Sequence, residues 1–137
     1  IIETAPTTLQ VIQKGPIESK DVVTMLGKYH LFLFPTLGEN FGHVILEAMA
    51  AGCAILISDA TPWRGLQEKG YGWEIPLSRP ESFVAALNEA VSWDAARFAE
   101  VSAAARTAAA AYLEHAGNVD ANRSMFAAMV NFSSNAA

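Results

Sequence analysis

The chain has 137 residues, of which 52% are hydrophobic and 17% are charged, and its formal net charge is −5 at pH 7. This composition predicts one compact globular domain with a hydrophobic core, and it excludes a disordered chain. The negative net charge argues against a nucleic-acid-binding surface, which is normally basic.

The single cysteine, Cys53, excludes an internal disulfide and fits a reducing compartment. No apolar run approaches the roughly 18 residues that span a bilayer, and no signal peptide pattern is present. The chain begins at Ile1 rather than at a methionine. We therefore expect it to be a piece of a longer protein.

The first part of the chain predicts a strand, a turn and a short helix. Residues 9–12 predict the strand, and the turn signal of Lys14, Gly15 and Pro16 closes it. Residues 18–28 predict the helix. The residues expected on its inner side are Val22, Val23, Met25 and Leu26.

The central stretch predicts a strand, a loop and a helix in close succession. Four large apolar residues, 31–34, stop at Pro35, which is typical of a buried strand in a parallel sheet. A loop carrying Glu39 follows. From about Phe41 the apolar residues recur at helical spacing, and Gly52 stands where a glycine would end the helix.

The pattern continues with further strands and helices. Residues 53–58 predict a second buried strand, and residues 70–75 predict a third. Between them, Thr61 and Pro62 predict the N-cap and first position of a short helix. Residues 79–91 predict a helix, and its expected apolar face consists of Phe83, Val84, Leu87 and Val91.

The C-terminal part is helical by composition. Alanine-rich residues 94–115 predict a long helix, and a last helix is expected from Asn118. Together with the strand–helix alternation, this predicts the α/β class, with a Rossmann-like, doubly wound parallel sheet and C-terminal helices. We expect a single domain over residues 1–137, comprising an α/β core at 11–92, C-terminal helices at 93–132 and a frayed tail at 133–137.

Glu47 is the one charged residue in the predicted central helix. A buried carboxylate without a partner is costly, and no lysine or arginine lies within one helical turn. Its partner must come from another segment or from a ligand, and ligand hydroxyls suit an acceptor-only carboxylate. Glu39 precedes the helix start, whose free N–H groups suit phosphate or sugar oxygens. In open α/β sheets, ligands bind at the carboxyl ends of strands, where this corner lies.

The two acids stand as Glu-x7-Glu inside Pro-Thr-x-x-Glu-x-Phe-Gly-x-x-x-x-Glu-Ala-Met-Ala-x-Gly, which begins at Pro35. This pattern resembles the donor-binding half of the retaining, GT-B-fold glycosyltransferases of group 1, family 4 type. A weaker resemblance covers about residues 11–91. The resemblance implies that the chain is part of the C-terminal domain of a GT-B fold.

The resemblance implies a role for each acid. Glu39 would be the catalytic residue, with its carboxylate hydrogen-bonded to the donor sugar beside the anomeric carbon, as nucleophile or as positioning group. The alternative for Glu39 is a loop carboxylate in water. Glu47 would accept hydrogen bonds from the ribose diol, and its alternative is an ion pair with an arginine from another element.

The resemblance also implies further donor-binding residues. Asn40, Phe41, Gly42 and His43 would present helix-start amides to sugar hydroxyls and diphosphate, although Phe41 fits a core role and His43 a surface or packed role better. Gly42 would let a ligand approach the backbone closely. Thr36 would donate to phosphate or cap the strand end. Lys14 and Gly15 would lie near the nucleotide base. The alternative for Lys14, which is the more ordinary one, is a solvated lysine in a turn.

Three stretches depart from the family pattern. Tyr29-His30 stands in place of Ala-Asp, and residues 52–55 replace Gly-x-Pro-Val. Residues 61–65 replace a glycine pair followed by glutamate in a loop that normally borders the ligand. Trp63 in this loop is either a ring contact or a packed indole.

The implied activity is transfer of a sugar from a nucleotide diphosphate sugar to a hydroxyl of an acceptor glycan, lipid or small molecule, with the anomeric configuration kept. The acceptor domain would precede this chain, so we expect the chain alone to be inactive. We expect no metal site and no cofactor, because no histidine or cysteine stands at metal-ligand spacing. We expect the full-length enzyme in the cytoplasm or at the inner membrane surface.

Two other functions remain open at this stage. One is a non-catalytic module that binds nucleotide sugars or docks a partner, against which Glu39 argues. The other is an epimerase-like enzyme on the same fold, which would turn over without an acceptor. An apolar face left by missing partner surfaces predicts self-association.

Overall fold

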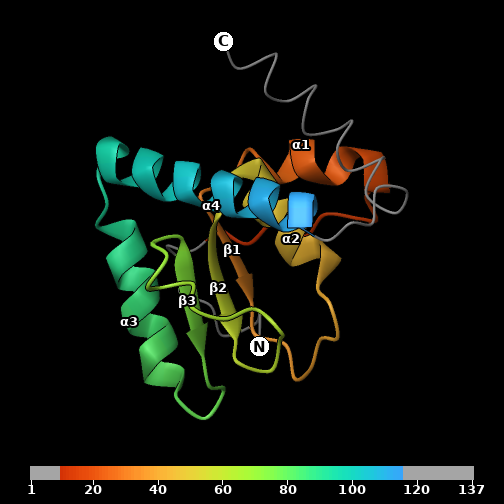
Figure 1. Ribbon diagram of the computed structural model, residues 1–137. Helices are drawn as coiled ribbons and strands as arrows, with labels where there is room; N and C mark the ends of the chain where they lie inside the picture. Colours follow the sequence, from red (N-terminus) through yellow and green to blue (C-terminus); the bar gives the residue numbers. More distant parts are fainter. Residues whose placement is uncertain (1–9, 116–137) are drawn as a thin grey trace.

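The computed structural model describes residues 10–115, so the helix expected from Asn118 and the tail at 133–137 lie outside the described residues. Figure 1 shows the element order: a 3-10 turn η2 (Ser19–Asp21), α1 (Val22–Leu26), β1 (Leu31–Phe34), α2 (His43–Ala51), β2 (Ala54–Ser58), β3 (Gly72–Ile75), α3 (Pro80–Val91) and α4 (Ala95–His115). Within residues 10–115, no helix combines the length and apolar character needed to cross a membrane.

The three strands form one parallel sheet in the order β1-β2-β3. Leu31 stands opposite Ala54, and Ile55 stands opposite Gly72. All residues of β2 are buried, as expected for the middle strand of a sheet that is covered on both faces. The predicted α/β class with a Rossmann-like parallel sheet is confirmed.

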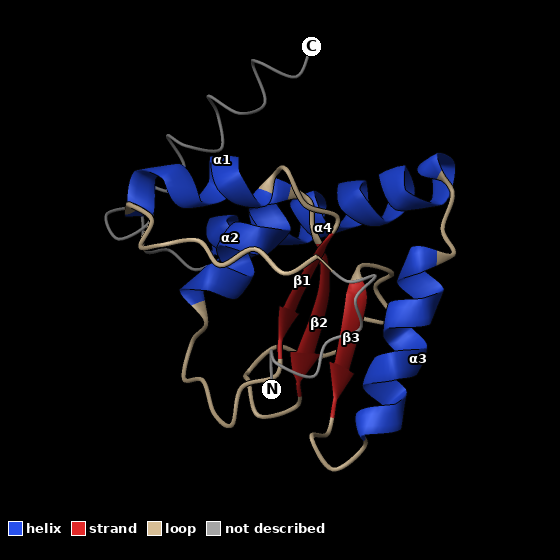
Figure 2. Ribbon diagram, turned by 180° about the vertical axis from the view of Figure 1, so that it is seen from behind, coloured by secondary structure: helices blue, strands red, loops and turns tan. Residues whose placement is uncertain are grey.

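Helices cover both faces of the sheet, so the core has two parts. On one face, α1, α2 and α4 enclose the larger cluster, to which β2 contributes Ile55 and Ile57. On the other face, α3 runs alongside β3 (Figure 2), and β2 contributes Leu56 to a smaller cluster with Trp73 and Ala86. Successive side chains of β2 therefore point to opposite faces, as strand geometry requires.

The central helix α2 is confirmed, although it begins at His43 rather than at about Phe41. Gly52 ends it at φ 85°, a left-handed conformation that favours glycine. A Cβ atom on Gly52 would lie 2.5 Å from Cζ of Arg106 and from Oγ of Ser102. Arg106 Nη2 also donates to the Ala51 carbonyl at 3.2 Å, so a cation of α4 stabilises the negative end of the α2 dipole.

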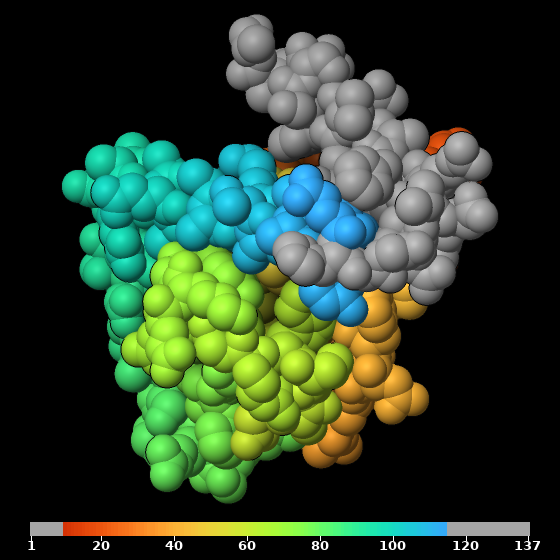
Figure 3. Space-filling model, viewed as in Figure 1, coloured from red at the N-terminus to blue at the C-terminus, as the bar shows by residue number. Residues whose placement is uncertain are grey.

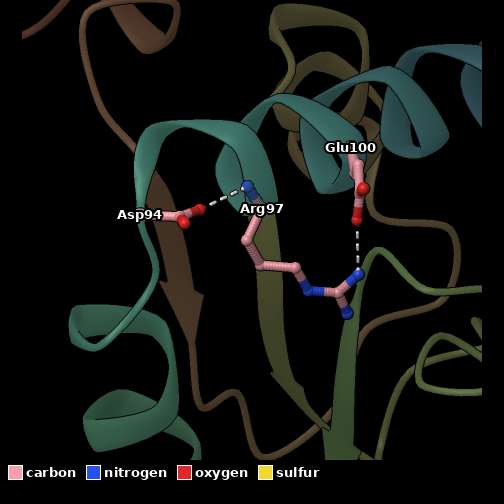
Figure 4. A network of polar contacts seen from close by, with 3 residues as sticks. All are labelled: Asp94, Arg97 and Glu100. Carbon is pink, nitrogen blue, oxygen red and sulfur yellow. Dashed lines mark hydrogen bonds and ion pairs between the residues drawn. The ribbon is translucent and has the colours of Figure 1, made fainter.

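The long helix α4 lies across α2 and begins with a polar network (Figure 4). The Arg97 backbone N–H donates to Asp94 Oδ1 at 2.8 Å, the contact expected of an N-cap residue. The Arg97 guanidinium forms an exposed ion pair with Glu100 at 3.0 Å. The predicted helix over residues 94–115 is confirmed, and the side chains of its Val101 and Leu113 are buried in the core.

Two local predictions are wrong, namely the first strand and the short helix at Thr61, and two others are confirmed only in part. Residues 10–12 of the predicted first strand are not extended in a sheet, and Val11 and Ile12 are 50% and 66% exposed. No described strand lies beside them to pair their backbone groups, and a short apolar pair does not form a strand alone. The predicted helix over residues 18–28 forms only as η2 and α1, with Val23 and Leu26 buried.

The short helix predicted at Thr61 does not form. The guanidinium of Arg64 donates to the carbonyl oxygens of Asp59, Thr61 and Trp63, so side-chain contacts use acceptors that a helix would give to its own amides. Helix α3 forms as predicted, but its buried residue is Ala86, flanked by Phe83 and Leu87.

Two residues of the predicted apolar face of α3 lie outside the core. Val84 is 56% exposed and Val91 is 84% exposed. The helix packs on β3 through positions 83, 86, 87 and 90, a stripe of small and large residues centred on Ala86. The prediction favoured the larger side chains over the alanines that permit close packing.

Candidate functional site

The candidate site lies where β1 and β2 end. The loop over residues 35–42 joins β1 to α2, and the segment over residues 59–71 follows β2. The Glu39 backbone N–H donates to the Ala60 carbonyl at 3.0 Å, and the Ser58 hydroxyl donates to the Thr36 carbonyl at 2.5 Å. The two loops are therefore joined to each other at the carboxyl edge of the parallel sheet.

Glu39 is partly exposed, and its carboxylate has one contact within its own loop. The Phe41 backbone N–H donates to Glu39 Oε1 at 3.2 Å. This bond aims the carboxylate toward the start of α2 rather than leaving it to rotate in solvent. A carboxylate that accepts one backbone hydrogen bond keeps most of its lone pairs for other donors.

Glu47 lies on α2, one turn after His43, and is half-buried. Burial raises the pKa of its carboxyl group, and the nearby His43 partly opposes this rise. Among residues 10–115, the Glu47 side chain has no ion pair within 4.0 Å and no hydrogen bond. The alternative for Glu47 was an ion pair with an arginine, and no arginine in the described part of the chain forms one with it.

The start of α2 has no side-chain cap, and Gly42 occupies the N-cap position at φ 77°. A Cβ atom at Gly42 would lie 2.7 Å from Ile45 Cδ1 and 3.2 Å from Glu39 Cγ. The space beside Gly42 is thus filled by the protein's own side chains, and the glycine is needed for its left-handed conformation. The uncapped first turn leaves backbone N–H groups that suit anionic or hydroxyl oxygens.

The other predicted residues of this loop have distinct surroundings. Asn40 and His43 are exposed. Phe41 packs against the larger core cluster, with its ring 4.3 Å from that of His43 and 5.8 Å from that of Tyr112. The Thr36 hydroxyl donates to the Gly38 carbonyl at 2.9 Å, so it serves its own loop.

Lys14 and Gly15 are exposed, in a segment without regular secondary structure. No hydrogen bond or ion pair within residues 10–115 joins either residue to the corner of Glu39 and Glu47. The structure thus brings together the predicted residues of the 35–47 stretch but not these two.

Two residues that were not among the predicted site residues, Trp63 and Glu74, hold the segment over residues 59–71 in place. The Trp63 indole N–H donates to the Phe41 carbonyl at 2.9 Å. Glu74 on β3 accepts the backbone N–H groups of Gly65 and Leu66 at 2.7 and 3.0 Å. The only signal for Trp63 was its place in a loop that departs from the family pattern, and nothing local marked Glu74.

A hollow of about 560 Å³ separates this segment from α4, which lies above it in Figure 3. Its lining combines aromatic and aliphatic residues with two cations. The lining consists of Phe41, Met49, Pro62, Trp63, Arg64, Lys69, Tyr71, Ala108, Ala111 and Tyr112. Neither Glu39 nor Glu47 lines it, so the hollow and the acidic corner share only Phe41 among the predicted residues.

Metal ligation has no candidate in the part of the chain that the structure describes. No group of three or more histidine, cysteine, aspartate or glutamate residues there is arranged to hold a metal ion.

Comparison with known proteins places this corner in a family. The chain matches glycosyl transferases, group 1, over residues 2–109, which is more than half of its length. The chain belongs to this family. The matched part of the chain includes β1, α2 and β2, and with them Glu39 and Glu47.

A curated relative is the serotype-specific mannosyltransferase WbdA of Escherichia coli. It is 33% identical to this chain over 105 residues, which amount to 75% of the chain and 12% of the relative. The chain thus spans a small part of that protein's length. No solved structure matches the chain.

Proposed function

We propose that this chain is the donor-binding portion of a retaining, GT-B-fold glycosyltransferase of the family 4 type. The full enzyme would transfer a sugar from a nucleotide diphosphate sugar to an acceptor hydroxyl. The observation that supports this most is the half-buried Glu47 carboxylate, which has no hydrogen bond and no ion pair within 4.0 Å among the described residues and lies one turn from an uncapped helix start. A group that accepts only hydrogen bonds, placed there, suits a ligand diol.

Each part of the corner then has a role. Glu47 accepts hydrogen bonds from the ribose hydroxyls, and the amides at the α2 start face the diphosphate, where the helix dipole favours negative charge. Glu39, ahead of that start, holds the donor sugar beside its anomeric carbon. His43 is exposed one turn before Glu47 and can approach the same diphosphate.

The reaction breaks the bond between the anomeric carbon and the diphosphate oxygen, and the nucleoside diphosphate leaves with the bonding electrons. A bond forms from the acceptor oxygen to the anomeric carbon, and the proton of the acceptor hydroxyl passes to an oxygen of the leaving diphosphate. The protein's share is positioning the donor and stabilising the negative charge that develops on the leaving diphosphate. Because the relative WbdA is a mannosyltransferase, a mannose-bearing donor is the first sugar to test.

The test is NMR chemical-shift mapping of the 137-residue chain with UDP, GDP and ADP and with their sugar conjugates. We expect shifts concentrated over residues 36–47 and a preference for one nucleotide. Glu47→Gln should weaken binding about tenfold or more, because hydrogen bonds to a charged group contribute roughly 1.5–3 kcal/mol.

Glu89→Gln is the matched control, because Glu89 is an exposed acid on α3, on the other face of the sheet. It should bind like the wild type. Absence of shifts at millimolar ligand, or equal weakening by the two substitutions, would contradict a donor site at this corner.

A further inference from the structure

The backbone of Phe41 links two parts of the corner. Its N–H donates to the Glu39 carboxylate at 3.2 Å, and its carbonyl accepts the indole N–H of Trp63 at 2.9 Å. The next residue, Gly42, is the N-cap of α2. One residue thus carries both the bond that aims Glu39 and the bond that ties the start of α2 to the segment after β2.

We infer that Trp63 is a positioning residue of the donor site, which fixes the Glu39 carboxylate and the start of α2 relative to each other through the Phe41 backbone. This inference rests on the proposed donor-binding function. Trp63 touches no reacting atom in this role. It acts by holding Phe41, which lies 22 residues earlier in the chain.

Trp63 is itself held firmly, as a positioning residue must be. The adjacent Arg64 donates to three carbonyl oxygens of its own segment, those of Asp59, Thr61 and Trp63. On the other side, the Trp63 ring lies 4.9 Å from the ring of Tyr112 on α4, tilted by 41°. The indole is therefore anchored to both the sheet edge and α4.

Two further hydrogen bonds join the 35–42 loop to the end of β2 and the segment after it. Ala60 accepts the Glu39 N–H, and Ser58 donates to the Thr36 carbonyl. These contacts hold the base of the 35–42 loop, whereas only the Trp63 indole, among the described side chains, donates to the Phe41 carbonyl. Loss of the indole N–H would leave the loop attached at its base but would free the Phe41 peptide next to Gly42.

Trp63→Phe tests this role, because phenylalanine keeps an aromatic ring beside Tyr112 and removes the N–H donor. Trp93→Phe is the matched control, since Trp93 stacks on Trp73 at 5.5 Å on the other face of the sheet. Both variants are compared with the wild-type chain by amide hydrogen exchange and by ligand binding.

In Trp63→Phe we expect exchange at the amides of Phe41, Ile45 and Leu46 to become roughly fivefold faster, the factor that corresponds to one ordinary hydrogen bond. Ile45 and Leu46 donate to the Gly42 carbonyl and so report on the first turn of α2. If the exchange rates of these three amides do not change, or if Trp93→Phe raises them equally, the inference is overturned, and this test needs no ligand.

The binding measurement separates positioning from general stability. Affinity for the nucleotide diphosphate sugar should fall about fivefold in Trp63→Phe, while affinity for the nucleoside monophosphate, which relies on Glu47, should not change. Equal losses for both ligands would indicate a merely structural role. If the wild-type chain binds no nucleotide, the proposed function fails and the exchange result alone decides whether Trp63 holds the loop.

A measurement on the wild type covers the case in which Trp63→Phe does not fold. The indole N–H of Trp63 should exchange at least several-fold more slowly than that of Trp93, because only the former donates to a carbonyl in the described part of the chain. Equal exchange of the two indoles would refute the hydrogen bond on which the inference depends.

Discussion

Glu74 offers the sharpest test of how the segment after β2 is held. Its two carboxylate oxygens accept the N–H groups of Gly65 and Leu66 at 2.7 and 3.0 Å, and its side chain is partly buried beside the fully buried Leu66. A net hydrogen bond to a charged group contributes roughly 1.5–3 kcal/mol. Because the two bonds share one side chain and are not additive, we expect Glu74→Ala to lower the free energy of unfolding by about 2–4 kcal/mol.

Glu74→Gln should lower the free energy of unfolding by about half as much, because the glutamine amide keeps one acceptor oxygen and presents a donor where the second acceptor stood. Urea unfolding followed by tryptophan fluorescence gives both values from the midpoints, provided that the denaturant slopes agree. Glu89→Ala is the control, since that exposed side chain takes part in no hydrogen bond within residues 10–115. A Glu74→Ala value within about 0.5 kcal/mol of the control would refute the assigned role.

Three further results are expected. Burial raises the pKa of the Glu47 carboxyl group, so the native state binds the carboxyl proton more tightly than the unfolded state does. The stability that this proton contributes is lost as the pH rises above the usual carboxyl pKa. In urea unfolding, Glu47→Gln should therefore gain stability over the wild type between pH 4 and pH 7, and a difference independent of pH would contradict this. Gly42→Ala should cost about 1–3 kcal/mol in the same assay, from the left-handed strain and the contact with Ile45, whereas Gly15→Ala, which has open space, should cost little. Burial raises the pKa of the Cys53 thiol to about 11, although Arg106 opposes this rise. Iodoacetamide at pH 8 should therefore label the thiol slowly in the native chain and fast in urea. Rapid labelling of the native chain would contradict a buried thiol.

The elements around the candidate site could be predicted from the sequence because local signals agree there. The four apolar residues of β1 end at Pro35, and Gly52 ends α2 in the left-handed conformation that its type favours. The order strand, loop, helix then puts Glu39 and Glu47 at the carboxyl edge of the sheet. Their place at this edge follows from topology, and it needed no knowledge of distant partners.

The short helix predicted at Thr61 fails because other groups take the hydrogen bonds that it would need. At Thr61 the helix start signal is real, since its hydroxyl still accepts the Trp63 N–H at 3.4 Å. However, Glu74 takes the Gly65 N–H that a helix would have paired with Thr61, and Arg64 takes the carbonyl. A carboxylate on β3 therefore decides the conformation of a loop nine residues earlier, and no window around Thr61 contains that information.

The same reasoning explains why Trp63 could not be assigned from its neighbours in sequence. A tryptophan after a proline in a loop is compatible with a ligand contact and with simple packing, and the choice depends on what its N–H meets. In the structure it meets the Phe41 carbonyl, whose own position is set by the Glu-x7-Glu stretch. The family pattern thus locates the acids, whereas a residue outside that pattern constrains how they are presented. Departures from a family pattern beside an otherwise intact motif are accordingly the places where this chain's own positioning contacts should be sought.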